Sequence, residues 1–392
     1  MRPNSSTRSS STRAHRSLDP PLCERMSGYD IAIAGAGPAG SVFALLAARA
    51  AYRVLLLERS RLGKPRLGEI APPELRPMLA RLGLEHLTRQ RFCRDAPEVV
   101  SVWGTSKPAA RNYIFSPYGS GIHIDRRAFD EALAAAAGEA GADVRLGRAV
   151  RFIRHPHGGY IADLIDDRQR CQIAVLATGR CGGGLGLPYA RRYLDDQVAV
   201  AGRFVSPSRH AVSRLIVEAI PGGWFYLTRL SDTSAMAVLV TLARLVPGER
   251  RRRLRWYMEA LARTDTTRRA LNGYALPQEV SVTNARACVA RPGVGDHWLA
   301  IGDARIAPDP LSGQGLVWAI DHAVTAMDLL TRLTWQELAE RMRAHMLRDL
   351  HTYLAQRSRV YAIERRFGRD AYWASVRDLA QSQPDRVQAT LS

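Results

Sequence analysis

The sequence predicts an α/β fold: a parallel-sheet domain, an antiparallel-sheet domain inserted into it, and helices toward the C-terminus. Residues 29–34, 38–51 and 53–58 have the patterns of a buried strand, an Ala-rich helix and a second buried strand. They therefore predict a βαβ unit with a short crossover. Apolar residues alternate within 197–204 and 212–244, as in antiparallel strands. Because buried-strand patterns return near residue 300, we expect the parallel sheet to be completed after the insertion.

The remaining elements are predicted from the same patterns. In the antiparallel region, the clearest alternating segments are 214–218 and 235–242. The other expected elements are buried strands at 171–178 and 297–302 and helices at 127–141, 249–271, 313–331 and, for most of its length, 335–380.

Composition and charge limit the class of protein. The chain has 392 residues and a formal net charge of +19, and no apolar stretch approaches the roughly 18 residues needed to span a membrane. A basic surface attracts acidic partners. Because the arginines are not interleaved with aromatic residues, an acidic protein is a better partner than nucleic acid. Five widely spaced cysteines, without a C-x-x-C pair, favour neither disulfides nor a metal site. Reduced thiols of this kind predict a cytoplasmic enzyme. The sequence leaves its oligomeric state undetermined.

The first 27 residues are rich in Ser, Arg and Pro. Since this composition cannot bury a core, we expect residues 1–27 to be a disordered tail. The segment lacks the apolar region of a secretory signal. Met26, which directly precedes Ser-Gly-Tyr-Asp and the first strand, is an alternative start of the native protein.

A glycine motif, Gly35-Ala-Gly37-Pro38-Ala39-Gly40, follows the first expected strand and opens the first expected helix. This context is typical of a dinucleotide-binding turn, in which Gly35 permits the tight turn, Gly37 admits a pyrophosphate and Gly40 packs the helix on the strand. The helix N-terminus offers N–H groups to the anion. Glu58 ends the next strand, where a carboxylate accepts hydrogen bonds from a ribose. The alternative, a plain turn, does not account for the strand, helix and acid around the motif.

A second motif indicates which dinucleotide is bound. Residues 298–316, WLAIGDARIAPDPLSGQGL, combine a buried strand, a Pro- and Gly-rich loop and the start of a helix. Asp303 at the strand end is suited to the ribityl hydroxyls of a flavin. The segment Gly313-Gln314-Gly315 lets backbone N–H groups and a helix dipole approach the isoalloxazine ring. The alternative is an ordinary strand-to-helix loop. The pairing of the two motifs favours FAD.

Both motifs resemble those of FAD-dependent monooxygenases with the p-hydroxybenzoate hydroxylase fold, a group that includes flavin-dependent tryptophan halogenases. Four further segments resemble the halogenase-like branch, and the resemblance extends over about residues 28–380. These segments are Arg66-Leu-Gly68-Glu69-Ile-Ala-Pro72, Asp125-Arg126-Arg127-Ala-Phe129-Asp130, Ala177-Thr178-Gly179-Arg180, and Tyr361-x-x-Glu364-Arg365-Arg366-Phe367 with Trp373.

Two departures separate the chain from halogenases of that branch. Halogenases use a lysine after the G-E segment, but no lysine lies between Gly68 and Trp103, and Lys107 is in the wrong position. They also carry G-W-x-W-x-I-P, whereas residues 223–229 read GWFYLTR. The chain instead resembles flavoproteins that hydroxylate a tryptophan of a partner protein during cysteine tryptophylquinone biogenesis in amine dehydrogenases and oxidases.

The resemblance implies FAD as cofactor, NAD(P)H as reductant, and a flavin-dependent monooxygenase acting on a tryptophan of an acidic protein. Two alternatives stay open: a halogenase or oxidase of a small aromatic metabolite, and a flavin-binding assembly factor without turnover. The implied FAD-binding residues are Gly35, Gly37, Pro38, Ala39, Gly40, Glu58, Arg59, Arg66, Glu69, Arg126, Asp303, Gly313, Gln314 and Gly315.

Four residues are candidates for the substrate pocket. Trp224 and Tyr226 share one face of an expected strand, so they either stack on an aromatic substrate or pack in the core. Pro310, with Pro308, is expected to form a wall over the flavin. Asp309 either orients substrate or serves the turn. Weaker candidates are Tyr113 and His123, and the basic helix at 249–271 either faces solvent or docks the acidic partner.

The implied division of the chain is a disordered tail, a discontinuous FAD-binding domain, a substrate domain and a C-terminal helical region. The corresponding residues are 1–27 for the tail; 28–75, 120–180 and 283–330 for the FAD-binding domain; 76–119 and 181–282 for the substrate domain; and 331–392 for the helical region.

Overall fold

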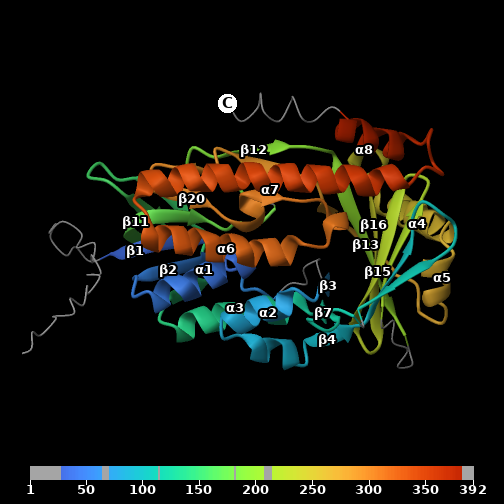
Figure 1. Cartoon of the computed structure of the whole chain (residues 1–392), viewed down its shortest axis with the longest axis horizontal. Coiled ribbons are helices and arrows are strands. Elements are labelled where there is room, and N and C mark those ends of the chain that lie inside the picture. Colours follow the sequence, from blue (N-terminus) through green and yellow to red (C-terminus); the bar gives the residue numbers. More distant parts are fainter. Residues whose placement is uncertain (1–27, 64–69, 114, 181, 207–213, 382–392) are drawn as a thin grey trace, which may run out of the picture.

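A computed structural model of the chain describes residues 28–63, 70–113, 115–180, 182–206 and 214–381. The expected tail at 1–27, the alternative start at Met26, and the candidates Arg66 and Glu69 lie outside the described residues. The molecule is elongated, with a helix-covered sheet at one end and a second sheet at the other (Figure 1).

The first sheet has eight strands in the order β19-β20-β11-β1-β2-β8, with β10 pairing with β11 and β9. The neighbours from β20 to β8 are parallel, as the βαβ pattern predicts. The strands are β1 (Tyr29–Ala34), β2 (Val54–Glu58), β8 (Asp143–Leu146), β9 (Arg151–Arg154), β10 (Tyr160–Asp163), β11 (Arg168–Leu176), β19 (Val294–Gly295) and β20 (Trp298–Ala300).

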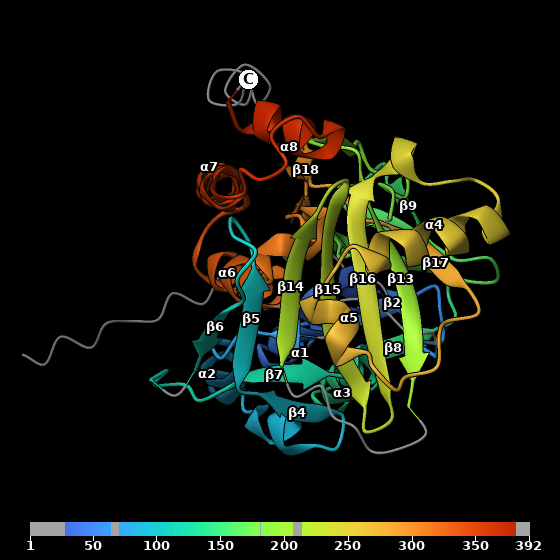
Figure 2. The ribbon, with the colours of Figure 1, turned by 90° about the vertical axis from the view of Figure 1, so that its right-hand side faces the viewer.

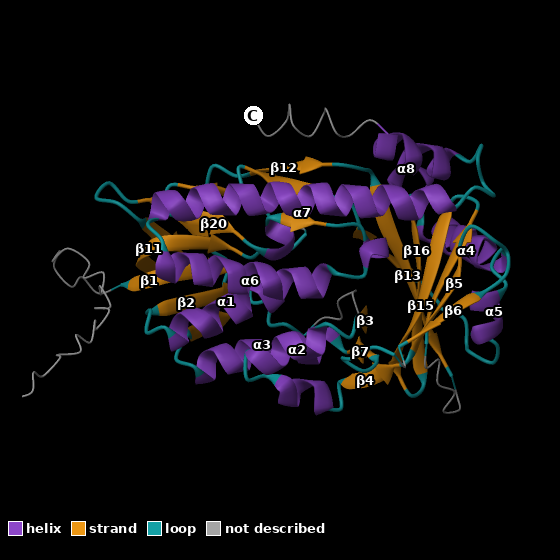
Figure 3. Cartoon of the chain, in the orientation of Figure 1, coloured by secondary structure: helices purple, strands orange, loops and turns teal. Residues whose placement is uncertain are grey.

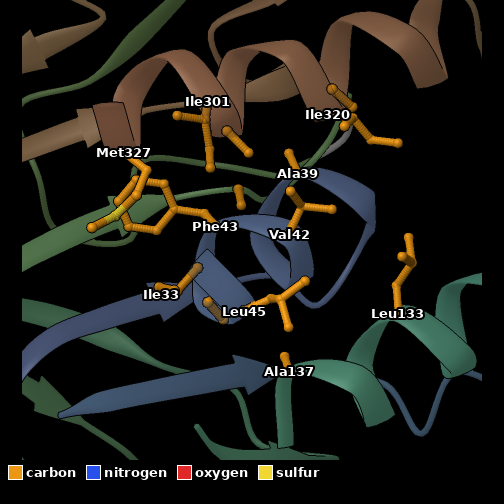
Figure 4. Close-up of a cluster of buried hydrophobic side chains, with 14 of the residues drawn as sticks. Ile33, Ala39, Val42, Phe43, Leu45, Leu133, Ala137, Ile301, Ile320 and Met327 are labelled. Atoms are coloured by element: carbon orange, nitrogen blue, oxygen red, sulfur yellow. The ribbon is translucent and has the colours of Figure 1, made fainter. Parts of the chain in front are cut away.

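Helices α1 (Pro38–Arg49), α3 (Arg126–Glu139) and α6 (Gly315–Arg332) pack beside this sheet, and α1 contacts both α3 and α6. Helix α1 is buried over most of its surface because its residues are apolar and small enough for close approach. One buried cluster contains Phe43 of α1, Met327 of α6, and Ile301, which follows β20 (Figure 4). The α/β prediction for this region is confirmed.

The second sheet has seven strands in the order β17-β13-β16-β15-β14-β5-β6 and is antiparallel except where β14 meets β5. Helices α4 (Arg250–Ala262) and α5 (Thr266–Ala270) cover one face of it (Figure 2). The strands are β5 (Glu98–Val102), β6 (Ala109–Asn112), β13 (Gln197–Val205), β14 (Leu215–Ile220), β15 (Gly223–Ser231), β16 (Ser234–Leu242) and β17 (Val280–Asn284).

The single helix predicted at 249–271 is wrong, because the chain forms two helices there. Glu218 of β14 accepts hydrogen bonds from the backbone N–H groups of Asp265, at 2.8 Å, and Thr267, at 2.8 Å. These are N–H groups at the start of α5, so a carboxylate from a strand of the sheet caps the second helix. A cap from so distant a segment leaves no local pattern in the sequence.

Two small sheets and the C-terminal helices α7 (Trp335–Ile363) and α8 (Ala371–Gln381) complete the fold. Helix α7 runs along one side of the molecule from the first sheet to the second (Figures 1 and 3), and it begins with a capping box between Thr334 and Glu337. The small sheets are β3 (Ile70–Ala71), β7 (Gly121–Ile124) and β4 (Cys93–Ala96), and β12 (Ala190–Tyr193), β18 (Cys288–Arg291) and β21 (Ile306–Ala307). The other helices are α2 (Leu75–Arg81) and the short 3₁₀ turns η1 (Glu85–Arg89), η2 (Ala243–Leu245), η3 (Gly302–Ala304) and η4 (Pro310–Ser312).

We predict that Phe43→Ala lowers the free energy of unfolding by about 3–5 kcal/mol, because the ring is completely buried between α1 and its neighbours and its removal leaves a cavity. Chemical denaturation followed by circular dichroism measures this. Val324→Ala in α6, where the side chain is 38% exposed, is the control and costs much less. Equal losses in the two variants would contradict the packing described for α1.

Candidate functional site

The first glycine motif forms a turn with no room for side chains at two positions. Gly35 has φ of +110°, and a Cβ atom built on it would lie 2.3 Å from the carbonyl oxygen of Ala177. A Cβ atom on Gly40 would lie 1.9 Å from the carbonyl oxygen of Gly35. The turn is therefore pressed against the end of β11, and only glycine fits at these positions.

The turn leads into a helix whose N-cap residue, a glycine, has no side chain with which to cap it. Gly37 is the N-cap residue of α1, Pro38 occupies the first turn, and no acidic residue lies in that turn. Free N–H groups and the positive end of the helix dipole at such a terminus suit an anionic phosphate. Glu58 lies at the same loop, where its Oε2 accepts a hydrogen bond from the backbone N–H of Ala36 at 3.2 Å.

The second glycine motif meets the first in space. Gly302 has φ of +59°, and a Cβ atom built on it would lie 2.8 Å from Cβ of Ala39 and 3.7 Å from Cα of Ala319. Ala39 is in the first turn of α1 and Ala319 is near the start of α6. Gly302 therefore lies between the two helices and brings their N-terminal turns together.

Asp303, directly after Gly302, keeps an accessible carboxylate. Its side chain is 26% exposed and lies 3.5 Å from the guanidinium of Arg180. Arg180 also donates hydrogen bonds to the carbonyl oxygens of Pro308, at 2.7 Å, and Arg286, at 2.9 Å. The A-T-G-R segment after β11 thus supports the loop that contains the second motif.

The start of α6 borders open space. A Cβ atom on Gly313, where φ is +61°, or on Gly315 would meet nothing within 4 Å among the residues that the structure describes. Gln314 is the N-cap residue but its side chain does not cap α6, because its Oε1 accepts a hydrogen bond from Nε1 of Trp318 at 3.0 Å. Two helix starts without a cap from their own N-cap residues, an accessible carboxylate and an open glycine segment together fit a flavin dinucleotide.

The other implied cofactor residues lie farther from the glycine turns in the chain. Arg59 is exposed just after β2. Nε of Arg126 forms an ion pair with Oδ1 of Asp130 at 3.2 Å, and Asp125 caps the helix that they begin. Their assignment to FAD stays a prediction.

Both carboxylate oxygens of Asp309 accept hydrogen bonds within the protein. Its side chain is buried, Oδ1 accepts a hydrogen bond from the backbone N–H of Leu311 at 3.0 Å, and Oδ2 accepts one from Nε of Arg357 at 2.8 Å. Of the two roles that the sequence allows, the turn role is present. Pro310 follows in η4 and is partly exposed.

Trp224 and Tyr226 lie on one face of β15, as predicted, with ring centroids 6.0 Å apart. Trp224 is buried, and Trp103 lies against it at 6.2 Å between centroids. Trp103 also contacts Trp373 at 5.2 Å, so the C-terminal segment completes the cluster. Trp224 is thus a core residue of the described structure, while Tyr226 is only partly buried.

Of the weaker candidates, His123 lies in β7 and Tyr113 directly follows β6. His123 is buried with Nδ1 3.0 Å from Oγ1 of Thr228, and Tyr113 is partly buried. Lys107 is exposed between β5 and β6, where its carbonyl oxygen accepts a hydrogen bond from Thr105 at 3.1 Å.

The described part of the chain contains neither a metal-binding cluster nor a membrane-spanning helix. Among the described residues, no group of three or more His, Cys, Asp or Glu side chains has an arrangement that could hold a metal ion. Within the same part of the chain, no helix combines the length and the apolar character that crossing a bilayer requires.

Sequence reasoning missed the residues that hold the second motif in place, namely Asp195, Asp349, Tyr353 and Arg357. The last three lie on α7 four residues apart, a spacing that predicts one helix face. The spacing could have predicted that these three residues share a helix face, but it does not predict which segments that face contacts.

Comparison with known proteins gives consistent matches. A family model described as tryptophan halogenase matches residues 30–97. The putative FAD-dependent oxidoreductase LodB of Marinomonas mediterranea is 26% identical over 365 residues, which cover 89% of this chain and 96% of that protein. A 1H-pyrrole-2-carbonyl-(peptidyl-carrier protein) brominase of Pseudoalteromonas luteoviolacea is 24% identical and covers 77% of each chain.

Solved structures share the fold. The myxobacterial chondrochloren halogenase CndH has a TM-score of 0.79 at 19% identity, covering 93% of this chain and 89% of that one. The peptidyl tryptophan dihydroxylase QhpG has a TM-score of 0.73 at 22% identity, covering 92% and 80%. The predicted fold class, including the inserted antiparallel sheet and the C-terminal helices, is confirmed. In sequence and in fold, the chain is therefore similar to FAD-dependent oxidoreductases and halogenases.

Proposed function

We propose that this chain is an FAD-dependent monooxygenase that hydroxylates a tryptophan side chain of an acidic partner protein, as a step in cysteine tryptophylquinone biogenesis. The observation that carries the proposal is the convergence at Gly302 of the starts of α1 and α6, neither of which is capped by the side chain of its own N-cap residue. This arrangement is suited to the pyrophosphate and the isoalloxazine ring of one flavin dinucleotide. Similarity to a putative FAD-dependent oxidoreductase along nearly its whole length supports it.

Each part of the cofactor has a matching group. The N-terminus of α1 at Gly37 is suited to the pyrophosphate, Glu58 to the adenosine ribose, and Asp303 to the ribityl chain. The segment Gly313–Gly315 and the start of α6 are suited to the isoalloxazine ring, where the helix dipole stabilises negative charge. When bound there, FAD supplies the capacity to accept hydride from NAD(P)H and to activate O2.

The protein's own part in the reaction is then to position an aromatic ring and exclude water. An indole is electron-rich, so no acid–base pair is required next to it. Tyr226, only partly buried beside Trp224, is suited to contact an aromatic substrate.

Hydroxylation is favoured over halogenation by the placement of ammonium groups. The sequence contains only two lysines, and none lies between Gly68 and Trp103. Lys107 is exposed on the turn between β5 and β6. A halogenase requires an ammonium group near the flavin to direct hypohalous acid, and this chain does not supply one in the expected segment.

An acidic protein partner is supported by the charge on the layer outside the second sheet. Arg251, Arg252 and Arg255 of α4 are exposed, and Arg250 is paired with Glu279 at the surface. Such a surface accelerates association with an acidic protein, and the effect weakens as salt rises.

The second candidate is halogenation of a small aromatic metabolite. The tryptophan halogenase family model at 30–97 and the halogenase-like fold favour it. It differs from the main proposal in the atom added to the ring and in the size of the substrate.

The test is mass spectrometry of an acidic, tryptophan-containing partner protein co-expressed with the chain, repeated with purified components, NADH and isotopically labelled O2. We expect added oxygen on a tryptophan, with the label incorporated. Bromide-dependent bromination of a small aromatic compound added to the same mixture, with the partner's tryptophan unchanged, would support the second candidate. NADH consumption that the partner does not stimulate, with no product, would instead indicate an assembly factor.

We predict that Gly37→Val weakens FAD binding by at least about tenfold, equivalent to 1.4 kcal/mol. The backbone at Gly37 has φ of −78°, which valine adopts, so the substitution requires no change of backbone conformation. Fluorescence titration with FAD measures the affinity, and an unchanged thermal unfolding temperature of the protein without FAD is the control. Wild-type affinity would show that the pyrophosphate lies elsewhere.

We predict that Asp303→Ala weakens FAD binding by about tenfold to a hundredfold, since a hydrogen bond to a charged group contributes roughly 1.5–3 kcal/mol. Asp296→Ala provides a matched control, because Asp296 is also a surface aspartate paired with an arginine, Arg154. The same titration distinguishes the two. Equal affinities of both variants and the wild type would remove Asp303 from the site.

A further inference from the structure

One face of α7 is lined by four residues that contact the second motif and its surroundings. Asp349, Tyr353, Arg357 and Tyr361 follow one another at intervals of four, so they lie along a single stripe of the helix. Tyr353, Arg357 and Tyr361 are buried. From the sequence, this region is expected to be helical, and Tyr361 belongs to one of the segments that resemble the halogenase-like branch.

The stripe contacts the beginning of the second motif through Asp349. Its Oδ2 accepts a hydrogen bond from Nη2 of Arg305 at 2.7 Å, and the Arg305 side chain is 2% exposed. Nε2 of His322 in α6 lies 3.4 Å from the same oxygen. This contact joins α7 to the chain two residues after Asp303.

The stripe contacts the end of the same segment through Tyr353 and Arg357. The backbone N–H of Asp309 donates a hydrogen bond to Oη of Tyr353 at 3.0 Å. Nε of Arg357 donates to Oδ2 of Asp309 at 2.8 Å, and Nη2 of Arg357 donates to Oδ2 of Asp195 at 3.1 Å. Asp309 in turn caps the η4 turn that leads to Gly313.

Arg357 therefore joins carboxylates from two different segments. Asp309 belongs to the loop before α6, whereas Asp195 lies two residues before β13 of the second sheet. Asp195 also accepts a hydrogen bond from the backbone N–H of Ala287 at 3.1 Å. The side chains of Arg357, Asp309 and Asp195 are 2%, 1% and 6% exposed. Burial raises the pKa of Asp195, and the guanidinium of Arg357 opposes that shift.

Such a buried arrangement constrains geometry more than it adds stability, because desolvation offsets much of the attraction between the charges. A guanidinium has a rigid, planar set of donors, so the two carboxylates fix its orientation and it fixes theirs. The loop at 308–313 is held in addition by Arg180, which donates to the carbonyl oxygen of Pro308. The start of α6 follows within a few residues.

We infer that Arg357 is a positioning residue: it holds the 308–313 loop against α7 and so sets how Gly313–Gly315 and the start of α6 meet the flavin ring. This inference rests on the proposed FAD position but not on the substrate. It assigns the carboxylate of Asp309 to holding the loop in place. It also gives α7 a role in the reactivity of the bound flavin.

The test compares Arg357→Met with Arg359→Met, since Arg359 is an exposed arginine on the same helix. Both proteins are loaded with FAD, and the midpoint potential of the bound flavin is measured by spectroelectrochemistry. We expect Arg357→Met to lower the midpoint potential of the bound flavin by about 30 mV or more. For a two-electron couple, this corresponds to at least about tenfold weaker binding of reduced FAD relative to oxidised FAD. The reason is that the N-terminus of α6 shifts relative to the isoalloxazine ring, so the helix dipole stabilises the negative charge of reduced flavin less. Arg359→Met keeps the wild-type potential.

A double-mutant cycle with Asp309→Asn separates positioning from a general loss of stability. Asn retains an acceptor for the turn but loses the charge, so the potential shifts in the same direction, and the double variant shifts no further than either single variant. Additive shifts would contradict the inference. If Arg357→Met does not fold, Asp309→Asn and Arg357→Lys carry the test, because a lysine cannot hold both carboxylates in the same geometry.

The possible failures can be told apart. If the wild type and Arg359→Met do not bind FAD, both the proposed cofactor position and this inference fail. The other failure concerns only the inference about Arg357. It occurs if the wild type and Arg359→Met bind FAD, and Arg357→Met, Arg357→Lys or Asp309→Asn has the same flavin potential and visible absorption spectrum as the wild type.

Discussion

The close approach of α1 and α6 at Gly302 is the contact on which the rest of the site depends. A side chain at residue 302 would overlap Ala39, and Ala319 lies close by on the other helix. The small residues bring two helix N-termini, from opposite ends of the chain, to one place. Gly35 and Gly40 impose a similar constraint on the first turn, where the end of β11 occupies the space of any side chain. Close packing therefore sets the positions of the donors that are suited to an anionic cofactor.

Much of the fold was predictable because its signals are local. The βαβ unit, the second motif and the antiparallel strands all follow from apolar periodicity and glycine placement within a few residues. The face shared by Trp224 and Tyr226 also follows from strand parity. Parity does not predict burial, however, and the packing of Trp103 and Trp373 on Trp224 depends on segments far away in the sequence.

The parts that the sequence did not predict depend on contacts between distant polar groups. Glu218 divides the basic region into α4 and α5 by capping α5 from a strand 47 residues away. Arg357 lies 48 residues from Asp309 and 162 residues from Asp195. No periodicity links such residues, and each looks like an ordinary charged residue until the fold buries it. For Asp309, the sequence predicted a position in a turn, but it did not predict the contact with Arg357.

The most direct test of the FAD site is a crystal structure of the chain with FAD bound. The account predicts the pyrophosphate at the N-terminus of α1 beside Gly37. It also predicts the ribityl chain near Asp303 and the isoalloxazine ring at Gly313–Gly315, with the 308–313 loop still held by Arg357. A flavin bound away from the contact at Gly302, or a ring that does not reach the start of α6, would contradict it.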